Sequence, residues 1–204
     1  MNLDEVIQML KEAKSVEEID SKCVSNIFPV IKIMFNFDQK NSYHQYDLWY
    51  HSLHTVINLP KGIDDDMLYL SALFHDIGKP ETQQHGKKPD DLEMHYYGHP
   101  EVSERIVQDE ILPILDSSGI PYIDMKRLLY YVRYHDDRVS LKLKHLRRHL
   151  KLASFDDFRN LMLLQVADAK AHVIKPIVQK RIDICTDLYG SRGLENYKRI
   201  LNGE

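Results

Sequence analysis

Residues 70–80, LSALFHDIGKP, place a histidine and an aspartate side by side at the carboxyl end of a strongly apolar segment. This segment follows three consecutive aspartates at residues 64–66, and its spacing predicts a buried helix that Gly78 helps to end. A polar group in an apolar setting is costly unless it has a polar partner or coordinates a metal ion. His75 and Asp76 are therefore the first candidate ligands.

Four further residues of the ligand types stand in or beside other predicted helices. They are His51 in DLWYHSLHTV, His99 in HYYGHPEVSERI, His135 in YYVRYHDDR and Asp168 in LMLLQVADAKAH. Helical bundles commonly build metal sites from side chains that project inward from different helices. Mixed nitrogen and oxygen ligands suit Mn, Fe, Co, Ni or Zn, with Mg possible, whereas two cysteines are too few for a typical structural zinc site.

Helical periodicity recurs along the whole chain, and strand patterns are scarce. We expect helices over about 2–14, a short piece capped by Ser15 and Glu18, then 25–37, 47–59, 64–77, 99–117, 123–135, 141–150, 155–172, 176–189 and 194–202. Asp47, and Ser154 with Asp157, are expected at the starts of the helices over 47–59 and 155–172. Residues 81–97 are expected to form a polar loop. No repeat or change of composition marks a second domain. The sequence thus predicts one all-α helical bundle over residues 1–204.

Composition narrows the class of protein. Hydrophobic residues make up 43% and charged residues 28%, which is typical of a globular rather than a disordered chain. The two cysteines are far apart and form no C-x-x-C motif, so we expect a reducing cytoplasm and no disulfide framework. The first residues lack the pattern of a signal peptide, and no apolar run approaches 18 residues. Membrane association is therefore not expected.

Charge is distributed unevenly. The net charge of −4 does not favour a polyanion binder, yet residues 126–151 hold nine lysines and arginines against two aspartates. This basic stretch is either a solvated helix face or a rim that attracts phosphate. Arg133 and Arg138 flank His135 and are candidate phosphate-binding residues, because a guanidinium can bind two oxygens at once. Both interpretations remain open for these two arginines.

The order H…HD…H…H…D resembles the HD-domain superfamily of metal-dependent phosphohydrolases. Locally, HQYDLWYHSL, ALFHDIGKPET, HYYGH and LQVADA are similar to the HD segment of bacterial tRNA nucleotidyltransferases, over about residues 44–172. The resemblance implies a helical domain of the HD type. The 43 residues upstream resemble no nucleotidyltransferase catalytic head, so we expect a free-standing hydrolase rather than CCA addition.

The resemblance also implies a ligand set for one or two ions. The first ion would be held by His51, His75, Asp76 and Asp168. His99 and His135 would hold the second, with Asp76 between the two, since a carboxylate has two oxygens that can each bind a cation. The family's metal would lower the pKa of a bound water from about 16 towards 7. Asp76 and Lys79 are the expected catalytic residues, and Lys79 matches a lysine that contacts phosphate in many HD proteins.

Other histidines have weaker claims. His95, four residues before His99, is an alternative ligand, and His172 is a candidate to orient Asp168. His44 is a candidate cleft residue, whereas His54 fits helix packing. The remaining three fit a loop or the basic face: His85, His145 and His149.

The expected function is hydrolysis of a phosphoester: a nucleotide, a cyclic phosphate or the end of an RNA. A subgroup of HD nucleotidases has a glutamate where Lys79 stands, which weakens a 5′-nucleotidase interpretation. Two alternatives are a non-catalytic nucleotide- or RNA-binding module and a di-iron oxygenase. The sequence leaves the oligomeric state open.

Overall fold

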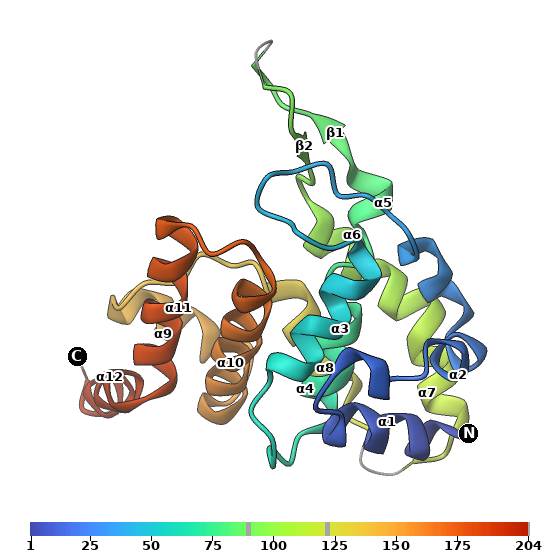
Figure 1. The fold of residues 1–204 in the computed structure, drawn as a ribbon. Helices are drawn as coiled ribbons and strands as arrows, with labels where there is room; N and C mark the ends of the chain where they lie inside the picture. Colours follow the sequence, from blue (N-terminus) through green and yellow to red (C-terminus); the bar gives the residue numbers. More distant parts are fainter. Residues whose placement is uncertain (89–90, 121–122, 204) are drawn as a thin grey trace.

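The computed structural model describes residues 1–88, 91–120 and 123–203, and helices dominate it (Figure 1). The elements are α1 (Leu3–Glu12), η1 (Val16–Glu18), α2 (Ser21–Ile27), η2 (Pro29–Met34), α3 (Leu48–Asn58), α4 (Asp66–Phe74), α5 (Lys79–Thr82), β1 (Gln84–His85), β2 (Met94–His95), α6 (His99–Ile106), η3 (Val107–Ile111), α7 (Leu112–Ser117), α8 (Met125–Tyr134), α9 (Leu143–His149), α10 (Phe155–Ala171), α11 (Pro176–Tyr189) and α12 (Ser191–Leu201). The predicted all-α class is confirmed.

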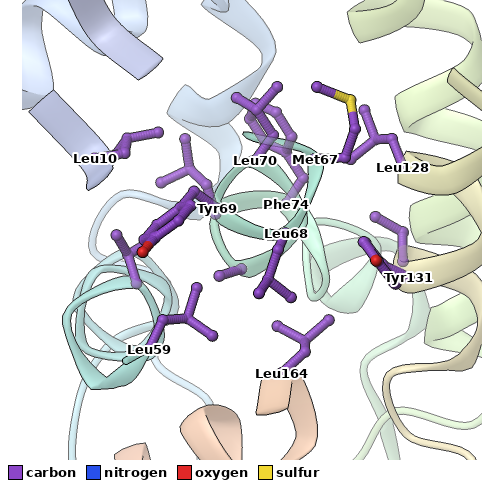
Figure 2. Packing of buried hydrophobic residues seen from close by; sticks show 14 of the residues in the cluster. Leu10, Leu59, Met67, Leu68, Tyr69, Leu70, Phe74, Leu128, Tyr131 and Leu164 are labelled. Atoms are coloured by element: carbon purple, nitrogen blue, oxygen red, sulfur yellow. The ribbon is translucent and has the colours of Figure 1, made fainter. Parts of the chain in front are cut away.

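Helix α4 lies at the centre of the core, packed against α1, α3, α8 and α10. Every residue from Met67 to Phe74 is buried. Figure 2 shows Leu10, Tyr131 and Leu164, from α1, α8 and α10, around this helix. The carboxyl end of α4 therefore lies inside the protein, and the next two residues, His75 and Asp76, are 0% and 2% exposed.

A buried carboxylate fixes the other end of α4. Asp65 caps this helix by accepting a hydrogen bond from the Leu68 backbone N–H. Its second oxygen accepts hydrogen bonds from the Tyr131 hydroxyl (2.7 Å) and the Asn160 amide (2.8 Å). Because these partners belong to α8 and α10, one side chain sets the positions of three helices that carry candidate ligands.

The predicted caps are confirmed at two other helices and wrong at a third. Asp47 caps α3, and Ser154 forms a capping box with Asp157 at the start of α10. Ser15 makes no such bond at η1, because the Glu18 carboxylate instead accepts from the Lys14 backbone N–H. The segment after Ser15 is only a short 3₁₀ turn.

Three stretches differ from the predicted helix and loop pattern. The helix expected over 25–37 is instead the end of α2, which stops at Ile27, followed by the 3₁₀ segment η2, because Pro29 has no backbone N–H to continue α2. Residues 99–117 are interrupted by the π-helical segment η3, ahead of Pro113, which has no backbone N–H to continue an α-helical ladder. Residues 81–97 are not wholly loop, because β1 and β2 pair antiparallel there and project from the helical body (Figure 1). Residues 89–90 of that predicted loop lie outside the described part.

Helices α9 to α12 form the side of the molecule coloured orange to red in Figure 1, and α11 packs along α10. Helix α10 also packs against α3, so it joins this side to the rest. Nothing in the described ranges is a helix with both the length and the apolarity needed to cross a bilayer.

Candidate metal centre

Five helices bring the six predicted ligands to one place. His51 is in α3, His75 and Asp76 follow α4, His99 begins α6, His135 follows α8, and Asp168 is in α10. All six are buried. Gly98, which precedes His99, adopts a positive φ of 79°, a conformation that costs glycine little and turns the chain into α6. Their role as ligands stays a prediction, but their predicted proximity is present.

One group, called here the four-residue group, consists of His51, His75, Asp76 and Asp168, whose candidate ligand atoms lie within 4.8 Å of one another. The His51 Nε2 atom is 3.1 Å from Asp168 Oδ1 and 3.3 Å from Asp76 Oδ2. The His75 Nε2 atom is 3.2 Å from that same Asp76 oxygen. These two imidazoles and two carboxylates could hold one divalent ion.

A second group uses the other oxygen of Asp76. Asp76 Oδ1 lies 3.1 Å from His99 Nε2 and 3.3 Å from His135 Nε2. These three residues form the three-residue group, whose ligand atoms also lie within 4.8 Å of one another. The carboxylate of Asp76 therefore presents one oxygen to each group, which is the arrangement needed to bridge two ions.

Backbone contacts orient three of the imidazole rings. In His75, His99 and His135, the Nδ1 atom faces the backbone carbonyl three residues earlier, at 3.0, 2.8 and 2.7 Å. A carbonyl only accepts hydrogen bonds, so each Nδ1 carries a proton and donates it. In its neutral form each ring then has an unprotonated Nε2, which can bind a metal ion. All three Nε2 atoms point into the cluster.

The spacing of the candidate ligand atoms suits a shared cation better than hydrogen bonds among these atoms. His99 Nε2 and His135 Nε2 are 3.1 Å apart, although both are acceptors in neutral rings whose Nδ1 is protonated. His51 Nε2, His75 Nε2 and Asp76 Oδ1 are buried without a hydrogen-bond partner in the described structure. Two ligand atoms at about 2.1 Å from one ion would be separated by about 3.0–3.4 Å, depending on the coordination angle. The spacings of 3.1–3.3 Å within the two groups match that range, and only the 3.7 Å between His75 Nε2 and Asp168 Oδ1 exceeds it among the printed spacings of the described residues.

Electrostatics keep the two carboxylates ionised. Burial raises the pKa of Asp76, but the positive charges of His75 and Lys79 outweigh it and hold this pKa well below its usual range. The pKa of Asp168 is lowered similarly, by His172 and His51 against the effect of burial. Burial lowers the pKa of His75, yet Asp76 and Asp168 together raise it to about 10. Without a cation, a proton on His75 compensates the carboxylates, so metal binding should release protons.

Lys79 lies beside this cluster. Its ammonium is 2.6 Å from Asp76 Oδ2 and donates to Gln39 Oε1 at 2.8 Å. The side chain is buried but lines a cavity of about 340 Å³, together with Asp76, His99 and Asp168. Lys79 thus holds the Asp76 carboxylate in place and faces the space where a substrate could enter.

The structure separates the two candidate phosphate arginines. Arg138 lines the 340 Å³ cavity. Arg133 does not, because its guanidinium lies 2.6 Å from Glu101 Oε1 and 3.2 Å from Glu104 Oε2, on α6. A phosphate contact by Arg133 stays a prediction that would require its guanidinium to leave these carboxylates.

Three of the other histidines line the cavity, and a fourth lies in the core. His95 lines the cavity but bonds to Asp91 at 2.8 Å, outside both groups. His172 faces the Asp168 backbone carbonyl at 2.9 Å and also lines the cavity, as does His44. The assignment of His149 to the basic face is wrong: it is fully buried, between Tyr130 and Asp137.

Sequence reasoning missed Arg181. This residue of α11 donates to the His135 backbone carbonyl (2.7 Å) and to Asp136 (3.0 Å), and lies 3.8 Å from Asp168 Oδ2. It stands beyond the segment that carries the motifs, in a helix without an HD-like pattern. No sequence signal distinguished it from the other arginines of the chain.

Comparison with known proteins identifies the family. The HD domain family matches residues 44–172, a range that includes all six candidate ligands. This chain belongs to the HD domain family. A CC-adding tRNA nucleotidyltransferase of Thermus thermophilus is similar to this chain, with 32% identity over 130 residues. That alignment covers 63% of this chain but only 28% of the nucleotidyltransferase. Helix α11, with Arg181, lies outside the residues matched by the family.

The two groups predict a metal stoichiometry. We expect the metal-saturated HD protein to hold two divalent ions per chain, measured by elemental analysis and by calorimetric titration of the metal-free protein. His99→Ala or His135→Ala should lower the number towards one, because the four-residue group remains complete. His95→Ala is the matched control and should leave two ions. One ion per wild-type chain at saturation would contradict a binuclear centre.

Proposed function

We propose that this HD protein hydrolyses phosphoesters with one or two divalent transition-metal ions. The observation that carries the proposal is the Asp76 carboxylate, whose two oxygens face two separate groups of buried histidines. Two-metal sites of this kind can stabilise both the attacking and the leaving oxygen of a displacement at phosphorus. Membership of the HD family supports the same reaction class.

The side chains around the cluster suit a phosphorylated substrate. A bound divalent ion would supply Lewis-acid polarisation of a phosphoryl oxygen and lower the pKa of water. Lys79 and Arg138 both line the cavity and would contact the non-bridging oxygens of the phosphate. In the overall reaction, the oxygen of water joins phosphorus, the bond to the leaving oxygen breaks, and that oxygen takes a proton.

The substrate proposed is a nucleotide, a cyclic phosphate or an RNA-end phosphoester. The likeness to a tRNA nucleotidyltransferase supports a nucleic-acid-derived substrate. Lys79, in the position where some HD nucleotidases have a glutamate, directs the proposal towards diesters and cyclic phosphates. A cytoplasmic location is proposed with it, on the basis of the two unpaired cysteines.

A metal and substrate screen tests this function. The purified chain would be analysed for bound metals, stripped, and reloaded with Mn, Ni, Co or Mg. Each form would then be assayed on p-nitrophenyl phosphate, bis(p-nitrophenyl) phosphate, 2′,3′-cyclic nucleotides and dinucleotides. We expect hydrolysis that depends on the added ion and disappears with chelator. Absence of hydrolysis in every loaded form would overturn the proposal. An oxygen-dependent reaction of the iron-loaded chain would instead support the di-iron alternative.

A further inference from the structure

A second cavity adjoins the one beside the metal centre. It has a volume of about 580 Å³ and lies between α10, α11 and the segment that follows α8. The two cavities share six lining residues: Asn41, His44, Asp136, Arg138, His172 and Arg181. A ligand in the larger space could therefore extend directly into the smaller one.

Part of the wall of the larger cavity is aliphatic, and the rest is polar or charged. Val139, Ile177 and Ile184 line it, and Ile177 is 66% exposed although it is a large apolar side chain. Ligand sites of this size, within the roughly 300–1,000 Å³ usual for small molecules, are mostly apolar with a few polar groups that fix orientation. An organic ring or sugar face would cover such a wall.

Two cations at the larger cavity have no acid to neutralise them. Arg181 is engaged by Asp136, and Asp137 is engaged by Arg148 and His149. Arg138 and Lys180 also line the cavity, and neither forms an ion pair within the described ranges of the chain. This leaves positive charge beside an aliphatic wall, which complements a ligand that combines an organic group with an anionic one.

We propose that the larger cavity holds a nucleotide unit of a phosphodiester whose scissile phosphate lies in the smaller cavity. The proposal rests on the proposed function and makes the substrate a diester of dinucleotide size, not a phosphomonoester. Hydrolysis adds the oxygen of water to phosphorus and breaks one of its bonds to a ribose oxygen. The leaving ribose oxygen takes a proton, so the products are one nucleoside hydroxyl and one phosphomonoester.

Contacts far from the reacting atoms raise kcat/KM when they are made in the transition state. The nucleotide in the larger cavity makes such contacts, and a single-ring monoester does not require them. We expect kcat/KM for 5′-phosphoadenylyl-adenosine (pApA) to exceed that for p-nitrophenyl phosphate by at least about tenfold. Adenylyl-adenosine (ApA), which lacks the 5′-phosphate, should fall between the two. Equal values for all three would overturn the proposal.

Two isoleucines close in sequence allow a matched test of the apolar wall. Ile177→Glu places a carboxylate on the cavity wall, whereas Ile174→Glu makes the same change at a residue that is 51% exposed and lines neither cavity. We expect Ile177→Glu to lower kcat/KM for pApA at least about tenfold more than for p-nitrophenyl phosphate, by removing apolar contact and repelling the anion. Ile174→Glu should leave the ratio of kcat/KM for pApA to kcat/KM for p-nitrophenyl phosphate unchanged. Equal ratios in the two variants would exclude a nucleotide at this wall.

The role of the Lys180 ammonium is tested in the same way. Lys180→Ala should bring kcat/KM for pApA towards that for ApA, because alanine offers no ammonium to bind the 5′-phosphate. Lys198→Ala removes the same charge at an exposed lysine of α12, away from the cavity. This variant should leave kcat/KM for pApA above that for ApA. If the two lysine variants lower kcat/KM for pApA equally, the effect is one of net charge, and the cavity is not the site.

Binding separates this proposal from the proposed function. Calorimetric titration of the metal-free chain with pApA needs no catalysis, and we expect Ile177→Glu to weaken binding whereas Ile174→Glu does not. Binding with this pattern but no hydrolysis under any metal would overturn the hydrolase and keep the nucleotide site. Hydrolysis of small esters, together with equal binding of pApA by both variants, would keep the hydrolase and overturn the nucleotide site. A longer 5′-phosphorylated oligoadenylate then distinguishes an RNA end from a free dinucleotide as the substrate. Cleavage of the oligoadenylate as fast as pApA indicates an RNA end, and cleavage of pApA alone indicates a free dinucleotide.

Discussion

Asp76→Asn should abolish hydrolysis and metal binding while leaving the helical fold intact. Among the residues that the structure describes, Asp76 alone has oxygens that face both groups of histidines, at 3.1–3.3 Å. An amide has one neutral acceptor oxygen in place of two anionic ones, so it cannot serve two cations. We expect kcat/KM to fall at least about a thousandfold, equivalent to roughly 4 kcal/mol of transition-state stabilisation.

Loss of catalysis in this variant must be distinguished from loss of folding. Asp76 also compensates the buried ammonium of Lys79 and the proton on His75, so Asp76→Ala would leave buried charge without a partner and is the harsher variant. Circular dichroism and thermal unfolding of Asp76→Asn, beside Asp116→Ala at an exposed aspartate of α7, provide the comparison. A folded Asp76→Asn protein with phosphoesterase activity within tenfold of wild type would contradict the metal-hydrolase proposal.

Gly78→Ala should damage the metal centre without touching a ligand. A Cβ atom at Gly78 would lie 2.5 Å from the Ser103 backbone nitrogen and 2.7 Å from the His99 carbonyl oxygen. Both belong to α6, whose first residue is the candidate ligand His99. The Gly78 N–H also donates to the Ser103 hydroxyl at 2.9 Å. Since backbone atoms cannot rotate away, α6 must move from Asp76 to admit the methyl group.

Overpacking of this kind costs about 1–3 kcal/mol, which corresponds to a fall of roughly 2–12 °C in Tm for a chain of this size. We also expect the loss of one bound ion, from the three-residue group. Gly190→Ala is the matched control, because its nearest contact would be the Thr186 carbonyl oxygen at 3.3 Å and its φ is an ordinary −85°. If Gly78→Ala unfolds at the same temperature as Gly190→Ala and keeps two ions, the close approach does not hold His99 in place.

Most helices were predictable from local signals, and the six candidate ligands were chosen from local signals together with the resemblance to the HD family. An apolar run preceded by aspartates predicted α4, and the Ser154 capping box predicted the start of α10, because both effects act within one turn. The adjacent His75 and Asp76, at the end of an entirely apolar helix, indicated a buried polar site because neither group is stable there alone. That residues 1–204 form one domain stays a prediction.

The basic stretch shows what local reasoning could not reach. Its excess of positive charge indicated either a solvated helix face or a phosphate rim. In the structure, Arg133 lies against two glutamates of α6, and Arg127 lies against Asp65 and Asp157. These acids are distant in the sequence, so the charge that remains for a ligand depends on which helices pack together. Arg138 lines the cavity without such a partner among the described residues.

The sequence by itself determined the all-α class and most helix starts, because periodicity and caps are properties of short segments. It also singled out the six candidate ligands, through costly buried polar groups and the resemblance of the motifs to the HD family. Tertiary structure alone decided which oxygen of Asp76 faces which histidines, why Gly78 admits no side chain, and that Arg181 of α11 borders the centre. Each of these depends on the separation between helices that are far apart in the chain. Those separations follow from packing of the whole core, and no segment encodes them alone.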